Sequence, residues 1–262
     1  GSSPRPPSPP KRLSAKGGLG AGRIALPEID STNAEGFRRA AGLPGPTWIL
    51  AGVQTAGRGR RARPWSSPQG NFHGTLVLKP TEPPETVALR SFAAALALRD
   101  ALVTVTGLPA SFSLKWPNDV LCNGGKLAGI LLESAGLGGP EPVLCIGIGV
   151  NLIAAPDPNL VEPGAVPPVS LLQETGLRLT PDAFLEALAP AYARWEATFT
   201  AEGFAPLRTA WLAHAARLGE PIRARTGKET REGVFETIDV GGNLILRMNQ
   251  GPVAISAADV FF

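Results

Sequence analysis

The sequence predicts an α+β protein, in which helices pack against a mixed β-sheet and a small β-barrel follows at the C-terminal end. Apolar residues at helical spacing across 83–105 and 180–199 predict two long helices with a buried face. Nearly continuous apolar runs at 127–132 and 143–150 predict strands that are covered on both sides. After Gly219 short alternating strands separated by turns predict a barrel of about 45 residues.

Helix-start and helix-end signals place the remaining elements. Thr32 and Glu35 have the spacing of a capping box, and Gly42 can end the helix that follows. Thr180, followed by Pro181, is a second helix start with threonine as the N-cap. Further elements are expected as strands at 48–51, 72–78 and 112–115, a helix at 204–216, and barrel strands at 220–226, 231–239, 243–248 and 253–256.

Three segments of different composition divide the chain. Residues 1–22 form a Pro/Ser-rich basic tail that cannot bury a core and is expected to be disordered. Residues 23–216 are expected to form the main domain, and residues 217–262 the small β-rich domain. The formal charge of +3 comes from the tail, which contributes +4, whereas the rest of the chain sums to −1. The basic balance therefore does not predict a folded face for nucleic acid.

The scarcity of two residue types excludes several kinds of site. The chain has two Cys and two His, too few for a disulfide framework or a Cys/His zinc cluster. Cys122 and Cys145 stand within apolar segments and are expected to be small buried hydrophobes. No apolar run is long enough to span a bilayer, and no hydrophobic leader follows the basic residues. We therefore expect a cytoplasmic protein with no membrane partner.

The densest chemical signal is the segment Gly57-Arg58-Gly59-Arg60-Arg61-Ala62-Arg63-Pro64-Trp65. Glycines let the backbone come close to a ligand, and arginines offer planar, permanently charged donors for phosphate and carboxylate. A loop that closes over an anionic ligand explains this composition. A solvated basic loop or an RNA-binding patch explains the segment by itself equally well.

Three later segments combine scarce residue types with glycine. Lys115-Trp116-Pro117-Asn118-Asp119-Val120 and Gly124-Gly125-Lys126-Leu127-Ala128-Gly129 hold two of the six lysines in a chain that has nineteen arginines. Gly147-Ile148-Gly149-Val150-Asn151 places glycines in a buried strand, which indicates close approach of another group. Ordinary turns with exposed lysines also explain the first two segments, so each is a weak signal by itself.

These segments, in this order and after Asp30-Ser31-Thr32-Asn33, resemble the biotin–protein ligase family. The motifs cover roughly residues 23–155. The resemblance implies a sheet of the class II aminoacyl-tRNA synthetase/biotin ligase type with an SH3-like C-terminal barrel. It also implies an enzyme that uses ATP to activate biotin to biotinoyl-5′-AMP. Biotin is then transferred to a lysine of a biotin carboxyl carrier protein domain of acetyl-CoA carboxylase or a related carboxylase.

The resemblance assigns roles residue by residue. The biotin contacts correspond here to Ser31, Thr32, Asn33, Gln54, Gly57, Arg58, Gly59, Arg60, Lys126 and Gly129. The ATP and adenylate contacts correspond to Arg58, Arg60, Arg63, Trp65, Asn118, Lys126 and Asn151. Catalytic roles fall on Lys126, Arg58, Arg60 and Asp119. No residue is assigned as a metal ligand, and Mg²⁺ is expected to come with ATP.

Two departures from the family and three alternatives complete the prediction. Ala62 stands where many relatives carry glycine, and only about 22 residues precede Arg23, too few for the winged helix of the repressor members, so no DNA binding is expected. Family members occur as monomers and as dimers, so the resemblance also allows a homodimer.

The nearest alternative is a lipoate–protein ligase. An RNA-binding protein is a third reading, and the C-terminal segment could act only as an interaction module.

Overall fold

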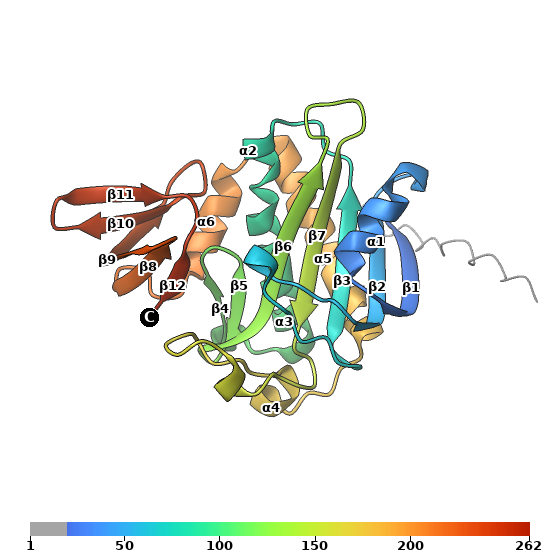
Figure 1. Cartoon of the computed structure of the whole chain (residues 1–262), viewed down its shortest axis with the longest axis horizontal. Helices are drawn as coiled ribbons and strands as arrows, with labels where there is room; N and C mark the ends of the chain where they lie inside the picture. The colour runs from blue at the N-terminus through green and yellow to red at the C-terminus, as the bar shows by residue number, and fades with distance from the viewer. Residues whose placement is uncertain (1–19) are drawn as a thin grey trace, which may run out of the picture.

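Residues 20–262 are described by the structure, which is a computed structural model. Its largest element is a mixed sheet of seven strands (Figure 1). The strands are β1 (Gly22–Ile29), β2 (Thr47–Gln54), β3 (Phe72–Leu78), β4 (Phe112–Lys115), β5 (Asp119–Cys122), β6 (Gly125–Ala135) and β7 (Val143–Val150). Their order in the sheet is β1-β2-β3-β7-β6-β5-β4, with β1 parallel to β2 and all other neighbours antiparallel.

Helices cover the two faces of this sheet unequally. They are α1 (Thr32–Arg39), α2 (Pro84–Val87), α3 (Arg90–Thr106), α4 (Leu171–Thr175), α5 (Pro181–Glu202) and α6 (Ala205–Ala213). The helices α3 and α5 pack on one face, where Phe72 of β3 meets Phe184 of α5 with ring centroids 5.3 Å apart. The helix α1 lies on the opposite face, where the hydroxyl of Thr75 on β3 donates a hydrogen bond to Oδ1 of Asn33 on α1. The larger core therefore lies on the α3/α5 side, and a smaller buried cluster that includes Val77 and Cys145 lies under α1. The rest of the α1 side keeps room for a ligand.

A second sheet of five strands forms the C-terminal unit. Its strands are β8 (Pro221–Thr226), β9 (Glu229–Ile238), β10 (Leu244–Met248), β11 (Gly251–Ile255) and β12 (Asp259–Phe261), in the order β11-β10-β9-β8-β12. The unit packs against the main sheet through α6, where Trp211 lies 6.3 Å from Phe235 between ring centroids. Trp116 also donates from Nε1 to the carbonyl of Gly242. One continuous set of buried side chains thus joins the two sheets.

The structure corrects two details of the sequence prediction. Ser31, and not Thr32, caps α1, because its side chain accepts a hydrogen bond from the backbone N–H of Ala34. The long helix expected across 83–105 is divided into α2 and α3, because backbone bonds spanning three residues tighten the chain around Ala88 and Leu89.

Three strands escaped the prediction. They are β1, β5 and β12. Two of them are only three or four residues long, and β1 contains Pro27 and no clear alternation. The predicted tail falls almost wholly outside the described residues, although β1 begins at Gly22, inside the range assigned to it.

Candidate active site

A pocket of about 710 Å³ opens on the α1 side of the main sheet. Its volume lies in the range typical of small-molecule sites. The strands β6 and β7 form its floor, and the segments 58–66 and 156–168 and the strand β12 form its rim. Of the residues assigned by resemblance, those lining the pocket are Ser31, Thr32, Asn33, Gln54, Arg58, Gly59, Arg60, Arg63, Trp65, Asn118, Asp119, Lys126, Gly129 and Asn151. Gly57 does not line it.

Gly57 has a supporting position beneath the loop. A Cβ atom built on this residue would stand 2.5 Å from Oγ of Ser67 and 2.9 Å from Nε2 of Gln54. The backbone of Gly57 also accepts a bond from the N–H of Trp65, which closes the loop. A side chain would therefore force the two ends of the loop apart, so glycine is required here for packing.

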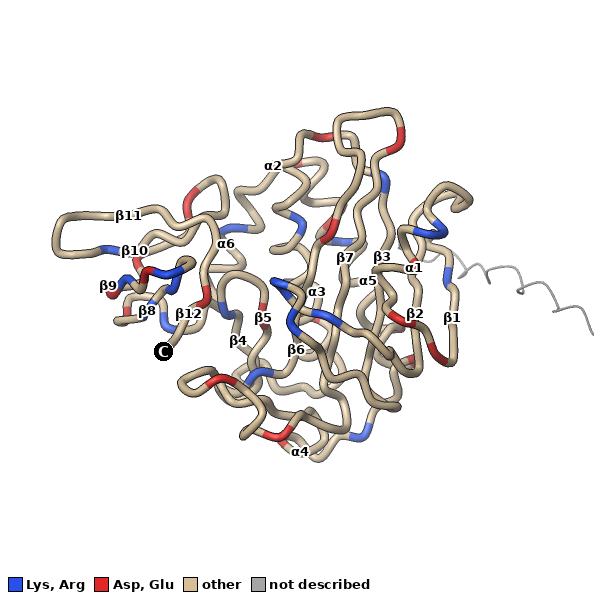
Figure 2. The backbone as a smooth tube through the Cα atoms, viewed as in Figure 1, with Lys and Arg blue, Asp and Glu red and all other residues tan. Residues whose placement is uncertain are grey.

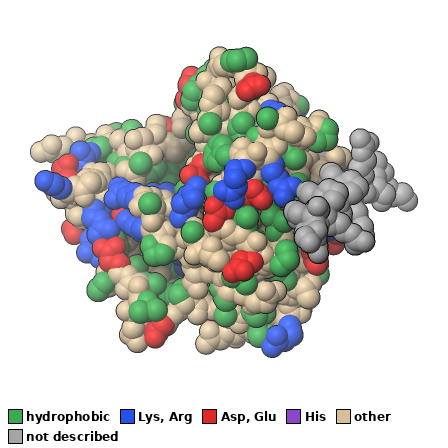
Figure 3. Space-filling model, turned by 45° about the vertical axis from the view of Figure 1, so that its right-hand side comes forward, with side chains coloured by type: hydrophobic (Ala, Val, Ile, Leu, Met, Phe, Trp, Pro, Cys, Tyr) green, Lys and Arg blue, Asp and Glu red, His purple; other side chains and the backbone are tan. Residues whose placement is uncertain are grey.

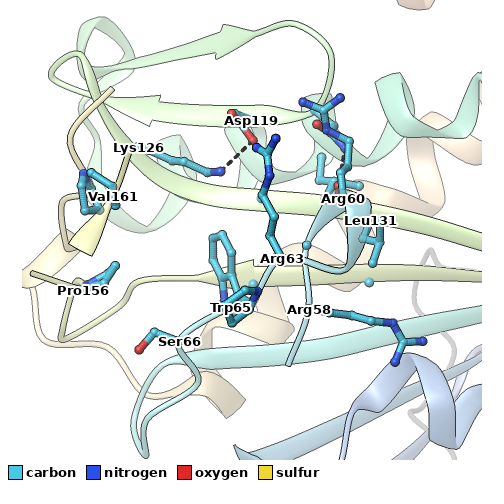
Figure 4. Close-up of a pocket in the computed structure, with 18 of the residues that line it drawn as sticks. Arg58, Arg60, Arg63, Trp65, Ser66, Asp119, Lys126, Leu131, Pro156 and Val161 are labelled. Atoms are coloured by element: carbon cyan, nitrogen blue, oxygen red, sulfur yellow. Dashed lines mark hydrogen bonds and ion pairs between the residues drawn. The ribbon is translucent and has the colours of Figure 1, made fainter. Parts of the chain in front are cut away.

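Trp65 packs against a pair of glycines in the floor. Gly129 and Gly149 are cross-strand partners on β6 and β7. A Cβ atom on Gly149 would lie 2.5 Å from the indole nitrogen, and one on Gly129 would lie 3.1 Å from the ring. The ammonium of Lys126 stands 5.3 Å from the centroid of the same ring (Figure 4). The two glycines thus create the room in which the indole and the lysine meet.

Asp119 joins two lysines at the side of the pocket. Its carboxylate lies 3.4 Å from Nζ of Lys126 and 3.8 Å from Nζ of Lys115. Burial lowers the pKa of Lys115, whereas the charge of Asp119 raises it. Both lysines come from strands that pair with β5, so the antiparallel register brings them to one carboxylate. This arrangement concentrates positive charge beside Trp65.

The opposite end of the pocket is lined by neutral polar side chains, with the ion pair of Arg58 and Glu133 beside them. Gln54 accepts from both the backbone N–H and the hydroxyl of Thr32, at 2.9 and 3.2 Å. The hydroxyl of Thr75 lies 2.7 Å from the hydroxyl of Thr32 and 2.6 Å from Oδ1 of Asn33. Ser31 completes the group at the start of α1. Hydroxyl and amide groups in this arrangement suit a neutral ligand that both donates and accepts hydrogen bonds.

The arginine loop, residues 57–65, crosses the front of the sheet (Figure 2). Its arginine side chains reach Asp259 of the C-terminal unit. The side chain of Asp259 on β12 is 9% exposed. Its carboxylate oxygens form ion pairs with the guanidinium nitrogens of Arg63 at 2.8 Å, Arg225 at 3.1 Å and Arg60 at 3.3 Å. Burial raises the pKa of Asp259, but the hydrogen bonds from Arg63 and Arg225 outweigh it and hold the pKa at about 2. In the space-filling view, basic side chains form a band across this side of the molecule, with acidic ones between them (Figure 3).

Arg58 is directed elsewhere. Its side chain extends away from Lys126 and Trp65 toward α1 (Figure 4). There it donates to Glu133 of β6 at 2.9 and 3.1 Å and to the hydroxyl of Ser31 at 3.3 Å. The loop thus distributes its arginines between two carboxylates, Glu133 at the polar end and Asp259 at the barrel.

Sequence reasoning missed Asp259, Glu133, Thr75 and the segment 156–168. A carboxylate within the apolar stretch 258–262 was a signal for Asp259, because such a residue is rarely buried without a cationic partner. Glu133 ends a buried apolar run in the same way. The segment 156–168 gave no signal, because only the fold brings it to the pocket.

Another prediction concerns two cysteines outside the pocket. Cys122 and Cys145 are buried and free, as expected, and burial raises the pKa of their thiols to about 11 and about 12. His73 is buried on β3 and its Nε2 lies 3.0 Å from the carbonyl of Pro68. In residues 20–262 no group of three or more His, Cys, Asp or Glu side chains converges as a metal site, and none of the helices is long and apolar enough to cross a bilayer.

Comparison with known proteins identifies the family. Residues 25–151 match the Biotin/lipoate A/B protein ligase family, and residues 218–262 match the Biotin protein ligase C terminal domain. A Biotin–[acetyl-CoA-carboxylase] ligase of Paracoccus denitrificans is 57% identical over 237 residues, which cover 90% of this chain and 99% of the relative. The chain belongs to the biotin protein ligase family.

Other biotin protein ligases agree with this membership. The Bifunctional ligase/repressor BirA of Escherichia coli is 30% identical over 249 residues, covering 93% of this chain and 76% of the relative. A biotin protein ligase of Aquifex aeolicus, solved in complex with biotin and ATP, is 25% identical and covers 91% of this chain and 97% of its own, with a TM-score of 0.75. The predicted α+β fold, with its mixed sheet and a small C-terminal unit, is confirmed, and that unit is a five-stranded antiparallel sheet.

Proposed function

We propose that this chain activates biotin with ATP to biotinoyl-5′-AMP and transfers the biotinoyl group to a lysine of a carrier domain, as a biotin–[acetyl-CoA-carboxylase] ligase. The observation that carries the proposal is one pocket with two chemically different ends. The neutral end holds Ser31, Thr32 and Asn33, and the charged end holds Lys126 and Trp65 beside the arginine loop. Biotin has the same polarity, with a neutral ureido ring at one end and a carboxylate at the other.

In the first step a biotin carboxylate oxygen attacks the α-phosphorus of ATP and pyrophosphate leaves. Both reactants are anions, so the site must offset their repulsion and stabilise the charge of the transition state. The ammonium of Lys126 lies over the ring of Trp65, and Arg60 lines the same pocket. We assign Lys126 to the carboxylate and the α-phosphate, and Arg60 and Arg63 to the adenylate.

Mg²⁺ is proposed to enter with ATP. Magnesium usually binds through substrate phosphates and water, with one or two carboxylates. The pocket carboxylates Asp119, Glu162 and Asp259 each pair with a cationic side chain. They therefore suit a role in placing lysines and arginines, and we expect the phosphates and water to supply most ligands of the ion. The ion would neutralise the leaving pyrophosphate.

In the second step the amine of the carrier lysine attacks the carbonyl of the mixed anhydride and AMP leaves. No protein nucleophile is needed, because the acyl group is already activated. The attacking amine must lose a proton, and Asp119 is the carboxylate beside Lys126 that is placed to receive it. A closed arginine loop would shield the adenylate from water until the carrier arrives. We place the reaction in the cytoplasm, where ATP and carrier domains are available.

The alternative of a lipoate–protein ligase is weakened by the neutral end of the pocket. Lipoate has an apolar dithiolane ring there, and four hydroxyl or amide side chains would be left without ligand partners, at a desolvation cost. The cluster of Ser31, Thr32, Asn33 and Gln54 favours the ureido ring of biotin. The RNA-binding reading is not supported, because the arginines of the loop are paired with Glu133 and Asp259.

The test is incubation with biotin, ATP, Mg²⁺ and a biotin carboxyl carrier domain, followed by intact mass of the carrier. The expected result is one added biotinoyl group on the carrier lysine, with ATP–pyrophosphate exchange that depends on biotin and not on lipoate. A carrier of unchanged mass would refute the proposed function. Exchange stimulated by lipoate alone would establish the alternative.

A further inference from the structure

Glu133 lies just beyond the polar end of the pocket. It follows Leu131 by two residues on β6, so its side chain is on the face that carries Leu131 and Gly129, both of which line the pocket. Its carboxylate accepts hydrogen bonds from two residues, from Nδ2 of Asn33 at 2.9 Å and from Nη2 of Arg58 at 2.9 and 3.1 Å. One carboxylate therefore joins the start of α1 to the arginine loop.

The contact with Glu133 determines the orientation of the Asn33 amide. An ionised carboxylate can only accept hydrogen bonds, so the amide nitrogen of Asn33 must be the atom that faces it. The second amide proton points to the carbonyl of Leu131 at 3.3 Å. The oxygen of Asn33 accepts from Thr75 at 2.6 Å and keeps one unused acceptor position. Asn33 can therefore only accept a further hydrogen bond from a ligand.

The contact with Arg58 has the complementary effect on Ser31. Arg58, held by Glu133, donates from Nη1 to the hydroxyl oxygen of Ser31 at 3.3 Å. The same oxygen accepts from the backbone N–H of Ala34 at 3.1 Å. Both of its acceptor positions are then occupied, and the hydroxyl proton of Ser31 is the group left for a ligand. Through its two contacts Glu133 makes Ser31 a donor and Asn33 an acceptor.

We propose that Glu133 is a positioning residue for biotin recognition, which rests on the proposed function of this site. It sets Asn33 to accept from a ureido N–H and Ser31 to donate to the ureido carbonyl, without touching the ligand itself. The Arg58 and Glu133 side chains are 34% and 29% exposed. An ion pair that is about one-third exposed is partly screened by solvent, so its loss costs less folding stability than the loss of a fully buried pair. Its effect should therefore be found in biotin binding.

The test is the variant Glu133→Gln, assayed by biotin-dependent ATP–pyrophosphate exchange. Glutamine keeps the length of the side chain but brings a donor to a place where Asn33 and Arg58 both donate. The KM for biotin should rise about tenfold, as expected for loss of one hydrogen bond to a charged group. The kcat and the KM for ATP should stay within about twofold of the unchanged chain. Glu28→Gln, at an exposed position of β1, is the matched control and should change none of them.

A double variant separates positioning from a general structural effect. If Glu133 acts partly through Asn33, Glu133→Gln should raise the KM for biotin less in an Asn33→Ala background than in the native background. An unchanged KM for biotin in Glu133→Gln, or fully additive effects in the double variant, would overturn the proposal. Absence of biotin-dependent exchange in the unchanged chain would instead refute the proposed function, so the two failures are distinguishable.

Discussion

At the scale of single residues, the chemistry of the site depends on a few side chains whose neighbours restrict them. Lys126 is held between the carboxylate of Asp119 and the ring of Trp65. Lys126→Ala should lower the rate of biotinoyl-5′-AMP formation about 100-fold or more, because a charge aimed at the transition state is lost. Release of pyrophosphate measures this step. Lys79→Ala, which removes an exposed lysine far from the pocket, is the matched control, and a normal rate in Lys126→Ala would remove Lys126 from the catalytic residues.

Gly149 tests the packing of the floor. A methyl group there would lie 2.5 Å from the indole nitrogen of Trp65, so the ring must move. Gly149→Ala should raise the KM for ATP and lower kcat/KM about tenfold or more, since a displacement of this size misplaces reacting groups. Steady-state exchange kinetics at saturating biotin measure it. Gly42→Ala, at an exposed position where a Cβ atom would meet nothing within 4 Å, should be neutral; equal KM values for ATP in the two variants would show that Trp65 does not act at the nucleotide.

At the scale of elements, the arginine loop is the segment that we propose to close over the pocket. Arg61 and Ala62 both adopt positive φ angles, of 57° and 56°, so the turn is formed without glycine at either position. The departure at Ala62 therefore concerns a residue in a backbone conformation that costs alanine about 1 kcal/mol. The loop reaches this conformation because Arg60, Arg61 and Arg63 are all held by Asp259.

Arg60→Gly should weaken the cover of the pocket. We expect biotinoyl-5′-AMP to escape and to label lysines of bystander proteins, several-fold above the level of the unchanged chain. Labelling of a non-carrier protein, read by streptavidin blot, measures the escape. Arg178→Gly is the control, since Arg178 is exposed and belongs neither to the loop nor to the pocket. Strict selectivity for the carrier in Arg60→Gly would mean that this arginine is not part of the cover.

At the scale of the whole molecule, Asp259 connects the barrel to the site. Its native pKa of about 2 lies below the usual value of 3.8, so its ionised form contributes stability that is complete above about pH 4 and is lost as the pH falls toward 2. Asp259→Asn should therefore lower the free energy of unfolding by on the order of 2 kcal/mol at neutral pH, and the difference should vanish near pH 2. Denaturant titrations from pH 7 to pH 2 measure it.

Glu236→Gln, at an exposed position of the barrel, is the control for this series. A constant difference between Asp259→Asn and the unchanged chain at every pH would contradict the assigned pairing. Removal of residues 217–262 would be a poorer test of the barrel, because Phe235 and Leu246 belong to the shared core and their loss would expose Trp211. The C-terminal unit is thus more than an interaction module, since β12 supplies part of the pocket rim.

The sequence by itself determined the fold class, the long helices, the buried strands and the segments that carry the chemistry, because these depend on periodicity and on residue types within short windows. Fourteen assigned residues line one pocket, from Ser31 to Asn151. Only the tertiary structure decided that Glu133 pairs with Arg58 and that Asp259 pairs with the other arginines of the loop. Those pairs join residues 75 or more positions apart. Contacts of that kind depend on how β6 and β12 are placed in space, and no local pattern contains that information.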